Sequence, residues 1–100
     1  EMDIPGTQVR DGIWVGLNTQ IAWDTCSIQG PVYIGSNCKI GPGCEIIGPA
    51  WIGHGCTLED QAQVVKSILF EYARVEKSRQ LNEVILSGSY CVDRHGRAVD

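Results

Sequence analysis

Residues 30–35 read Gly-Pro-Val-Tyr-Ile-Gly, and residues 48–53 read Gly-Pro-Ala-Trp-Ile-Gly. The two segments lie 18 residues apart and match almost position for position. An earlier copy, Asp-Gly-Ile-Trp-Val-Gly, occupies residues 11–16, and looser copies begin at Ser67 and Val84. Because these copies extend over most of a chain of 100 residues, they predict a repeat architecture and a single small domain.

Within each repeat, aliphatic residues recur at every sixth position. Allowing one inserted residue and two deleted residues, fifteen successive positions are Val, Ile or Leu: Val9, Val15, Ile21, Ile28, Ile34, Ile40, Ile46, Ile52, Leu58, Val64, Leu69, Val75, Leu81, Leu86 and Val92. A period of six matches neither a helix nor an alternating strand, but it fits a short strand followed by a two-residue corner. Three such units make a triangular coil of about 18 residues, whose strands stack in parallel on those of the next coil.

Side chains two positions before each aliphatic residue should also point into the coil, because successive side chains of a strand alternate. These positions are mostly small, as a narrow core requires: Ile13, Val32, Ala50, Ser67, Val84; Thr19, Cys38, Cys56, Ala73, Tyr90; Thr7, Cys26, Cys44, Ala62 and Arg79. The register stacks Cys26 on Cys44 and Cys38 on Cys56. An odd total of five cysteines is a poor disulfide framework, so we interpret the thiols as small reduced core residues.

The residue just before each inward aliphatic should face solvent. Two of the three outer faces are largely polar: Gln20, Lys39, Thr57, Arg74 and Cys91; Gln8, Ser27, Glu45, Gln63 and Gln80. The third face is apolar, flanked by a strip of glycines at residues 16, 35 and 53, and supplies our candidate interface residues: Trp14, Tyr33, Trp51, Ile68, Phe70 and Ile85. Contiguous exposed apolar groups typically mark an interface. The alternative is that they stack across strands and only stabilise the sheet.

Residues 34–44, Ile-Gly-Ser-Asn-Cys-Lys-Ile-Gly-Pro-Gly-Cys, resemble the hexapeptide repeat of left-handed parallel β-helices. The resemblance implies an all-β fold, a single-stranded left-handed parallel β-helix of about five triangular coils. The left hand comes from the resemblance and not from the period. We expect one domain over residues 1–100, with regular coils over about residues 7–93. Residues 94–100 should close the C-terminal end, with Ala98 or Val99 as a last inward residue.

Residues 12–18, 30–35, 67–72 and 90–93 are most similar to the C-terminal part of mannose-1-phosphate guanylyltransferase-like sugar-phosphate nucleotidyltransferases (NDP-sugar pyrophosphorylases). In that family the Gly-rich loop and the metal-binding aspartates lie in an N-terminal Rossmann-like domain. The resemblance therefore implies a non-catalytic module of an enzyme of nucleotide-sugar biosynthesis, which joins a nucleoside triphosphate to a sugar 1-phosphate with Mg²⁺ and releases pyrophosphate. It implies no catalytic, cofactor or metal residue in this chain. It also implies a homo-oligomer formed through the β-helix, and packing against the catalytic domain.

Two other functions are consistent with the same repeat. A hexapeptide acyltransferase fragment would need a histidine base at a subunit boundary, and His54, at a corner, is the candidate. A structural or binding scaffold without an enzyme is the other alternative. His95 lies in a polar turn beyond the last clear repeat. The metal-binding coils that this chain resembles use three histidines, whereas this chain has two, which argues against a metal site.

The net charge and the hydropathy of the chain argue against some classes of binding partner. The net charge is −4, which argues against nucleic acid and anionic membranes as partners. No apolar stretch approaches the roughly 18 residues of a membrane span, and no segment resembles a signal peptide. Together with the reduced thiols, this favours the cytoplasm. The chain opens on Glu1, so we expect it to be a piece of a longer protein.

Overall fold

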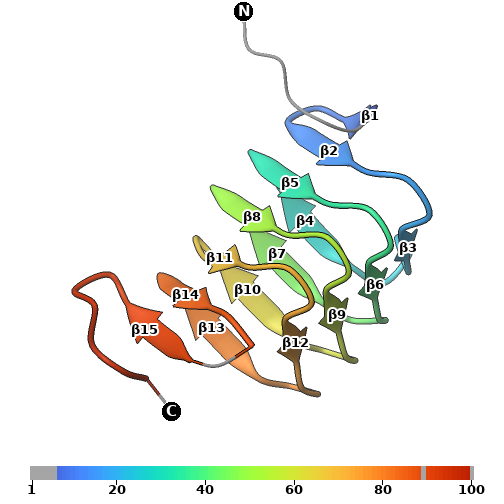
Figure 1. Cartoon of the computed structure of the whole chain (residues 1–100). Helices are drawn as coiled ribbons and strands as arrows, with labels where there is room; N and C mark the ends of the chain where they lie inside the picture. Colours follow the sequence, from blue (N-terminus) through green and yellow to red (C-terminus); the bar gives the residue numbers. More distant parts are fainter. Residues whose placement is uncertain (1–6, 89, 100) are drawn as a thin grey trace, which may run out of the picture.

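The computed structural model of the chain describes residues 7–88 and 90–99 (Figure 1). Short strands follow one another along this part of the chain, and none of its segments is a helix of the kind that crosses membranes. The strands are β1 (Thr7–Arg10), β2 (Ile13–Val15), β3 (Gln20–Ile21), β4 (Ser27–Gln29), β5 (Val32–Ile34), β6 (Lys39–Ile40), β7 (Glu45–Ile47), β8 (Ala50–Ile52), β9 (Thr57–Leu58), β10 (Gln63–Val65), β11 (Ile68–Leu69), β12 (Arg74–Val75), β13 (Gln80–Asn82), β14 (Val84–Leu86) and β15 (Cys91–Asp93).

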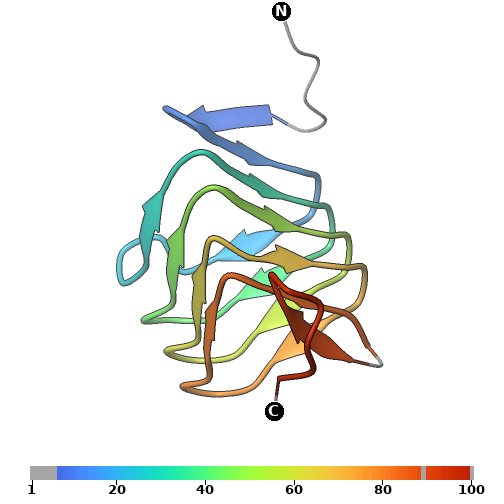
Figure 2. The same ribbon diagram turned by 90° about the vertical axis from the view of Figure 1, so that its left-hand side faces the viewer.

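Every third strand pairs in parallel, so the chain winds around three sheets. The first sheet runs β2-β5-β8-β11-β14, the second β3-β6-β9-β12 and the third β4-β7-β10-β13. Figures 1 and 2 show the coils stacked along one axis. The structure therefore confirms the β-helix. It contains four complete coils and the first strand of a fifth, slightly fewer than the five predicted.

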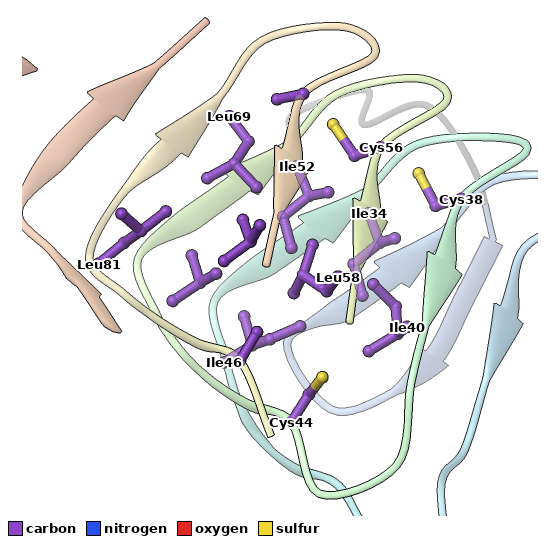
Figure 3. Close-up of a cluster of buried hydrophobic side chains, with 14 of the residues drawn as sticks. Ile34, Cys38, Ile40, Cys44, Ile46, Ile52, Cys56, Leu58, Leu69 and Leu81 are labelled. Atoms are coloured by element: carbon purple, nitrogen blue, oxygen red, sulfur yellow. The ribbon is translucent and has the colours of Figure 1, made fainter. Parts of the chain in front are cut away.

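The core is a column of side chains along the axis (Figure 3). Ile34, Ile46 and Ile52 are completely buried; Ile34 and Ile46 lie in one coil, in the first and third sheets, and Ile52 lies in the next coil. Cys38, Cys44 and Cys56 fill the space beside them, as their predicted inward direction requires. Burying one Val, Leu or Ile side chain contributes roughly 1.5–3 kcal/mol. The period-six aliphatic positions from Val15 to Leu86 thus form a continuous core, within which only Ile21 and Ile28, in the first coil, are half-buried.

The corners between the first and second sheets repeat one backbone conformation. Asn18, Asn37, Gly55 and Tyr72 have φ angles of 60°, 60°, 73° and 61° and lie above one another in successive coils. Glycine and asparagine adopt this left-handed conformation more readily than other residues do. Their repetition turns the chain sharply at the same place in each coil.

The C-terminal strand reverses direction. β15 pairs antiparallel with β14, and places Cys91 beside Leu86 and Val92 beside Ile85. Paired residues share a face, so Cys91 points inward and is 7% exposed, whereas Val92 lies on the outer face. Our predictions of an outward Cys91 and an inward Val92 were therefore wrong.

Other residues near this end also differ from the prediction. Tyr90 was expected to point inward, and it is exposed. Ala98 and Val99 are exposed as well, although the segment folds back on β15 through a bridge between Val92 and Ala98. Arg79, predicted inward, is half-buried and pairs with Glu76 at 3.2 Å. Asp100 lies outside the described residues.

The N-terminal strand is also antiparallel. β1 pairs with β2, and its register shifts between Gln8 and Arg10, so Val9 is left out of the pairing and is exposed. The prediction that Thr7 and Val9 point into the core was wrong, because β1 lies beside the first coil instead of forming part of it. The regular coils extend from Ile13 to Leu86 and are shorter than the predicted range of residues 7–93.

Arg10 and Trp23 meet at the N-terminal end of the coil. Arg10 is paired with the inward residue Ile13, and its guanidinium carbon lies 4.2 Å from the centroid of the Trp23 ring. Trp23 belongs to the corner that carries the inserted residue, and it packs against the core. A cation over an aromatic face is attractive, so this contact ties β1 to the corner that follows β3.

Candidate docking surface

The outer face of the first sheet carries the predicted apolar ladder. Strand pairing places Trp14, Tyr33, Trp51, Ile68 and Ile85 directly beside one another in successive coils. Phe70 follows Ile68 by two residues. The structure thus brings the six predicted interface residues to one face, which we call the ladder surface (Trp14, Tyr33, Trp51, Ile68, Phe70 and Ile85). Whether a partner covers it stays a prediction.

Exposure is concentrated in the middle of the ladder surface. Trp51, Ile68 and Phe70 are 45%, 40% and 45% exposed, whereas Trp14, Tyr33 and Ile85 are half-buried. The rings of Tyr33 and Trp51 are stacked, with their centroids 4.1 Å apart and their planes at 29°. Ring stacking across strands stabilises the sheet, so part of the ladder has that role in any case. The three exposed side chains are the ones left available to a partner.

The glycine strip beside the ladder has a backbone explanation. Gly35 and Gly53 are buried. A β-carbon on Gly35 would lie 2.8 Å from the backbone nitrogen of His54, and one on Gly53 would lie 3.0 Å from that of Glu71. The next coil therefore occupies the space that a side chain would need. We expected these glycines to form an exposed flat strip, and the structure shows that the close approach of neighbouring coils requires them.

A hollow opens in the ladder surface beside Trp51. It has a volume of about 480 Å³ and is lined by Tyr33, Trp51, Gly53, His54, Phe70 and Glu71. We call it the aromatic hollow. The sequence predicts its three aromatic residues, but not that His54 and Glu71 line the same hollow. The corner that follows β8 and the corner that follows β11 stack on each other, and this stacking was the available signal that His54 and Glu71 line the same hollow.

His54 lies at a corner with two neighbours. Its Nε2 atom is 3.4 Å from the side-chain nitrogen of Asn37, and its ring meets the ring of Tyr72 edge-on at a centroid distance of 5.4 Å. Asn37 and Tyr72 hold the imidazole between the coils above and below. These contacts position the ring, and neither of them is the carboxylate that commonly orients a histidine base.

His95 belongs to the polar turn that was expected for it. Its backbone nitrogen donates to Asp93 Oδ1 at 2.9 Å, and Arg97 donates to the same oxygen at 2.9 Å. These bonds hold the pKa of Asp93 below its usual value. His95 is exposed and serves the turn.

A second hollow of about 590 Å³ lies on the outer face of the second sheet. Gln20, Lys39 and Thr57 form its floor, and Glu59, Asp60 and Lys77 lie at the corner beside it. Glu59 is ion-paired with Arg74 and accepts a hydrogen bond from the backbone nitrogen of Lys77 at 3.3 Å. Positive and negative side chains lie close together here, as they do on an ordinary solvent-exposed surface.

The buried thiols bond to the carbonyls of the coil. Cys38 donates to Gly53 O at 3.2 Å, Cys44 to Glu59 O at 3.2 Å and Cys56 to Phe70 O at 3.1 Å. Burial raises the pKa of Cys56 to about 11 and also raises the pKa values of Cys38 and Cys44. A neutral, buried thiol is a poor nucleophile and a poor metal ligand, so these cysteines act as core residues.

Metal ligands are not gathered anywhere in residues 7–88 and 90–99. No group of three or more His, Cys, Asp or Glu side chains in this range is arranged to hold an ion. The ladder surface, with Trp51, Ile68 and Phe70 exposed, is the candidate docking surface of the described residues.

Comparisons with known proteins agree with this geometry. Residues 31–66 match the family described as bacterial transferase hexapeptide (six repeats). Over 99 residues, which are 99% of the chain, the sequence is 42% identical to UTP--glucose-1-phosphate uridylyltransferase of Synechocystis sp. (strain ATCC 27184 / PCC 6803 / Kazusa). The chain spans about a quarter of that protein, 26% of its length. The chain is thus a left-handed β-helix in which residues 31–66 match a hexapeptide-repeat family, and it is similar along nearly its whole length to part of a sugar-phosphate nucleotidyltransferase.

Proposed function

We propose that this chain is a non-catalytic module of a sugar-1-phosphate nucleotidyltransferase. The parent protein would join a nucleoside triphosphate to a sugar 1-phosphate and release pyrophosphate, with Mg²⁺ bound elsewhere in the protein. One observation carries the proposal: 42% identity extends over 99 residues that make up only 26% of the relative. A relative of that length has room for its chemistry outside the homologous part.

The proposal names the substrates only by class, as a nucleoside triphosphate and a sugar 1-phosphate. The relative is named for UTP and glucose 1-phosphate, whereas the sequence motifs resemble those of mannose-1-phosphate guanylyltransferase-like proteins. The β-helix carries neither a nucleotide loop nor a metal cluster in its described residues, so it supplies no basis for choosing between them.

The module would act through contacts made by the ladder surface. Exposed Trp51, Ile68 and Phe70 form a contiguous apolar patch, and such patches with aromatic anchors typically bind other protein surfaces. The occupant would be the rest of the parent protein, a second copy of the β-helix, or both. The module would thereby fix the arrangement of the catalytic domains.

A sedimentation experiment tests the docking function. The wild-type chain is compared with the double variant Trp51→Ser, Ile68→Ser, and with Gln63→Ser on the outer face of the third sheet as a matched control. We expect the wild type and the control to form the same assembly, either alone or with the separately purified remainder of the parent. The double variant should sediment as a single folded chain. Equal association of all three proteins, or of none, would contradict the docking function.

An activity assay tests the assignment as non-catalytic. The chain is incubated with UTP, glucose 1-phosphate and Mg²⁺, and pyrophosphate release is followed. We expect no release above the rate without protein. Turnover that depends on the chain would overturn this part of the proposal while leaving the docking function open to its own test.

A further inference from the structure

The aromatic hollow differs from the rest of the ladder surface because it contains a carboxylate. Its walls include the rings of Tyr33, Trp51 and Phe70, and Glu71 lies beside them at the start of the next corner. Glu71 is exposed, and no hydrogen bond or ion pair joins it to another residue in the described part of the chain. A purely apolar partner side chain placed here would cover a carboxylate without pairing it, which is unfavourable.

The arginines of this chain are already engaged elsewhere. Arg10 lies on Trp23, and the other four pair with carboxylates: Arg74 with Glu59, Arg79 with Glu76, Arg94 with Glu83 and Arg97 with Asp93. Lys39 and Lys77 line the hollow of the second sheet. No arginine or lysine of the described residues lines the aromatic hollow, so a guanidinium or ammonium group that pairs with Glu71 there would come from a partner.

We propose that the aromatic hollow binds an arginine side chain presented by a partner. The guanidinium would stack against the rings of Trp51 and Phe70 and donate hydrogen bonds to the carboxylate of Glu71. Arginine suits this combination better than lysine does, because its planar, weakly hydrated group both stacks on aromatic rings and pairs with a carboxylate. The inference rests on the proposed docking function and specifies the chemistry of the partner.

Charge complementarity favours this occupant over others. The chain has a net charge of −4, and Glu71 is the acidic group of the hollow, so a phosphate or an acidic peptide would be repelled. A second copy of this chain would have to break one of its own arginine contacts to supply the side chain. The remainder of the parent protein, which the proposed docking function offers as an occupant of the ladder surface, is therefore the source of the arginine that we favour.

A titration followed by NMR tests the inference on the isolated chain. The probe is N-acetyl-arginine methylamide, and the matched probe is N-acetyl-citrulline methylamide, which has nearly the same shape and no charge. We expect arginine to shift the indole N–H signal of Trp51 and the backbone amide signals of Gly53 and Glu71, with millimolar affinity. Citrulline should bind roughly threefold or more weakly, since it lacks the cation.

Two variants identify the groups responsible. Glu71→Gln should reduce the affinity for arginine to that for citrulline, and Trp51→Ala should remove the shifts at Gly53. Glu45→Gln, which neutralises an outward glutamate on the third sheet, is the control and should bind arginine as the wild type does. Retained dispersion of the other signals shows that each variant is folded.

The outcomes separate this inference from the docking function. If arginine produces no saturable shifts, or if citrulline or Glu71→Gln gives the same affinity, the inference is wrong. Assembly that depends on Trp51 and Ile68 would then still support docking through the ladder surface. Conversely, arginine binding in a chain that assembles with nothing would leave this site valid and contradict the docking function.

Discussion

Gly35 shows how one coil constrains the residues of its neighbour. A β-carbon at this position would meet the backbone nitrogen of His54 at 2.8 Å and the carbonyl carbon of Gly53 at 3.0 Å. Both atoms belong to the main chain of the next coil and take part in its stacking, so they cannot turn aside as a flexible side chain can. The volume is therefore closed to any side chain.

Gly35→Ala is expected to lower the free energy of unfolding by about 1–3 kcal/mol, the usual cost of overpacking. Gly88→Ala is the matched control, since no atom lies within 4 Å of its added β-carbon, and it should change the stability by less than about 0.5 kcal/mol. Urea denaturation of both variants measures the difference. Equal stabilities would show that the coils separate easily at this corner.

The thiol of Cys56 makes stability depend on pH. Its pKa is raised from 9.0 to about 11 because burial disfavours the thiolate. The folded protein holds this proton more tightly than the unfolded chain does, so the contribution is complete below pH 9 and is lost as the pH rises towards 11. We expect the free energy of unfolding to fall across this window.

Cys56→Ala should show a shallower fall in stability over the same window when both proteins are unfolded with urea at pH values on either side of 9. Some slope should remain, because the pKa values of Cys38 and Cys44 are raised as well. An unchanged slope in the variant would mean that the thiol ionises as readily in the fold as in the unfolded chain.

At the scale of the element, the turn that follows β15 is held by the carboxylate of Asp93, the last residue of the strand. Asp93 accepts backbone hydrogen bonds from His95 and Arg97, each at 2.9 Å, and the segment closes further through Val99 N donating to Cys91 O at 2.8 Å. The pKa of Asp93 is lowered from 3.8 by these bonds, so the stabilisation is present above pH 3.8 and is lost as the pH falls through the lower, folded-state pKa.

Asp93→Ala should therefore speed hydrogen exchange of the amides of Cys91, Asp93 and Val99 at neutral pH. The amides of β5 and β8 should exchange as in the wild type, because they lie in coils that do not contact the turn. Wild-type β15 should open in the same way at a pH well below 3.8. Uniform acceleration throughout the chain would instead place β15 within the cooperative core.

The elements also show how far a repeat can be predicted from its residues. The period of six located the inward positions from Val15 to Leu86, because each coil repeats the same strand direction and phase. It failed at Val9, Cys91 and Val92, where the strand runs the other way. The spacing of aliphatic residues does not show whether a strand runs parallel or antiparallel to its neighbour. An antiparallel strand can have a similar alternation of inward and outward residues, shifted by one residue.

The candidate surface was predictable to a similar extent. The six-residue register of the sequence predicts that Trp14, Tyr33 and Trp51 lie in one row, and strand pairing confirms it. It could not show that exposure would be greatest at Trp51, Ile68 and Phe70, since this depends on how neighbouring rings pack. The register also could not show why a glycine is present. Gly35 is required because the backbone of the next coil occupies the space of a side chain, and not because it forms a flat surface.

For the whole molecule, the two antiparallel strands limit growth of the β-helix. β1 covers the edge of β2 and β15 covers the edge of β14, so both ends of the first sheet carry a strand of the wrong direction for another coil. Within the described residues, the outer edges of β3 and β4 at one end, and of β12 and β13 at the other, have no paired strand. Their directions would suit a head-to-tail continuation if the caps were absent.

Removing both caps, by deleting residues 1–10 and 90–100, should therefore produce open head-to-tail polymers, because a heterologous contact that does not close adds further copies. Electron microscopy and light scattering would detect them, and deletion of one cap alone should give no filaments. The parallel repeat itself sets no limit to the number of coils. The antiparallel strands β1 and β15 end the stack on both sides, so they determine the length of the β-helix.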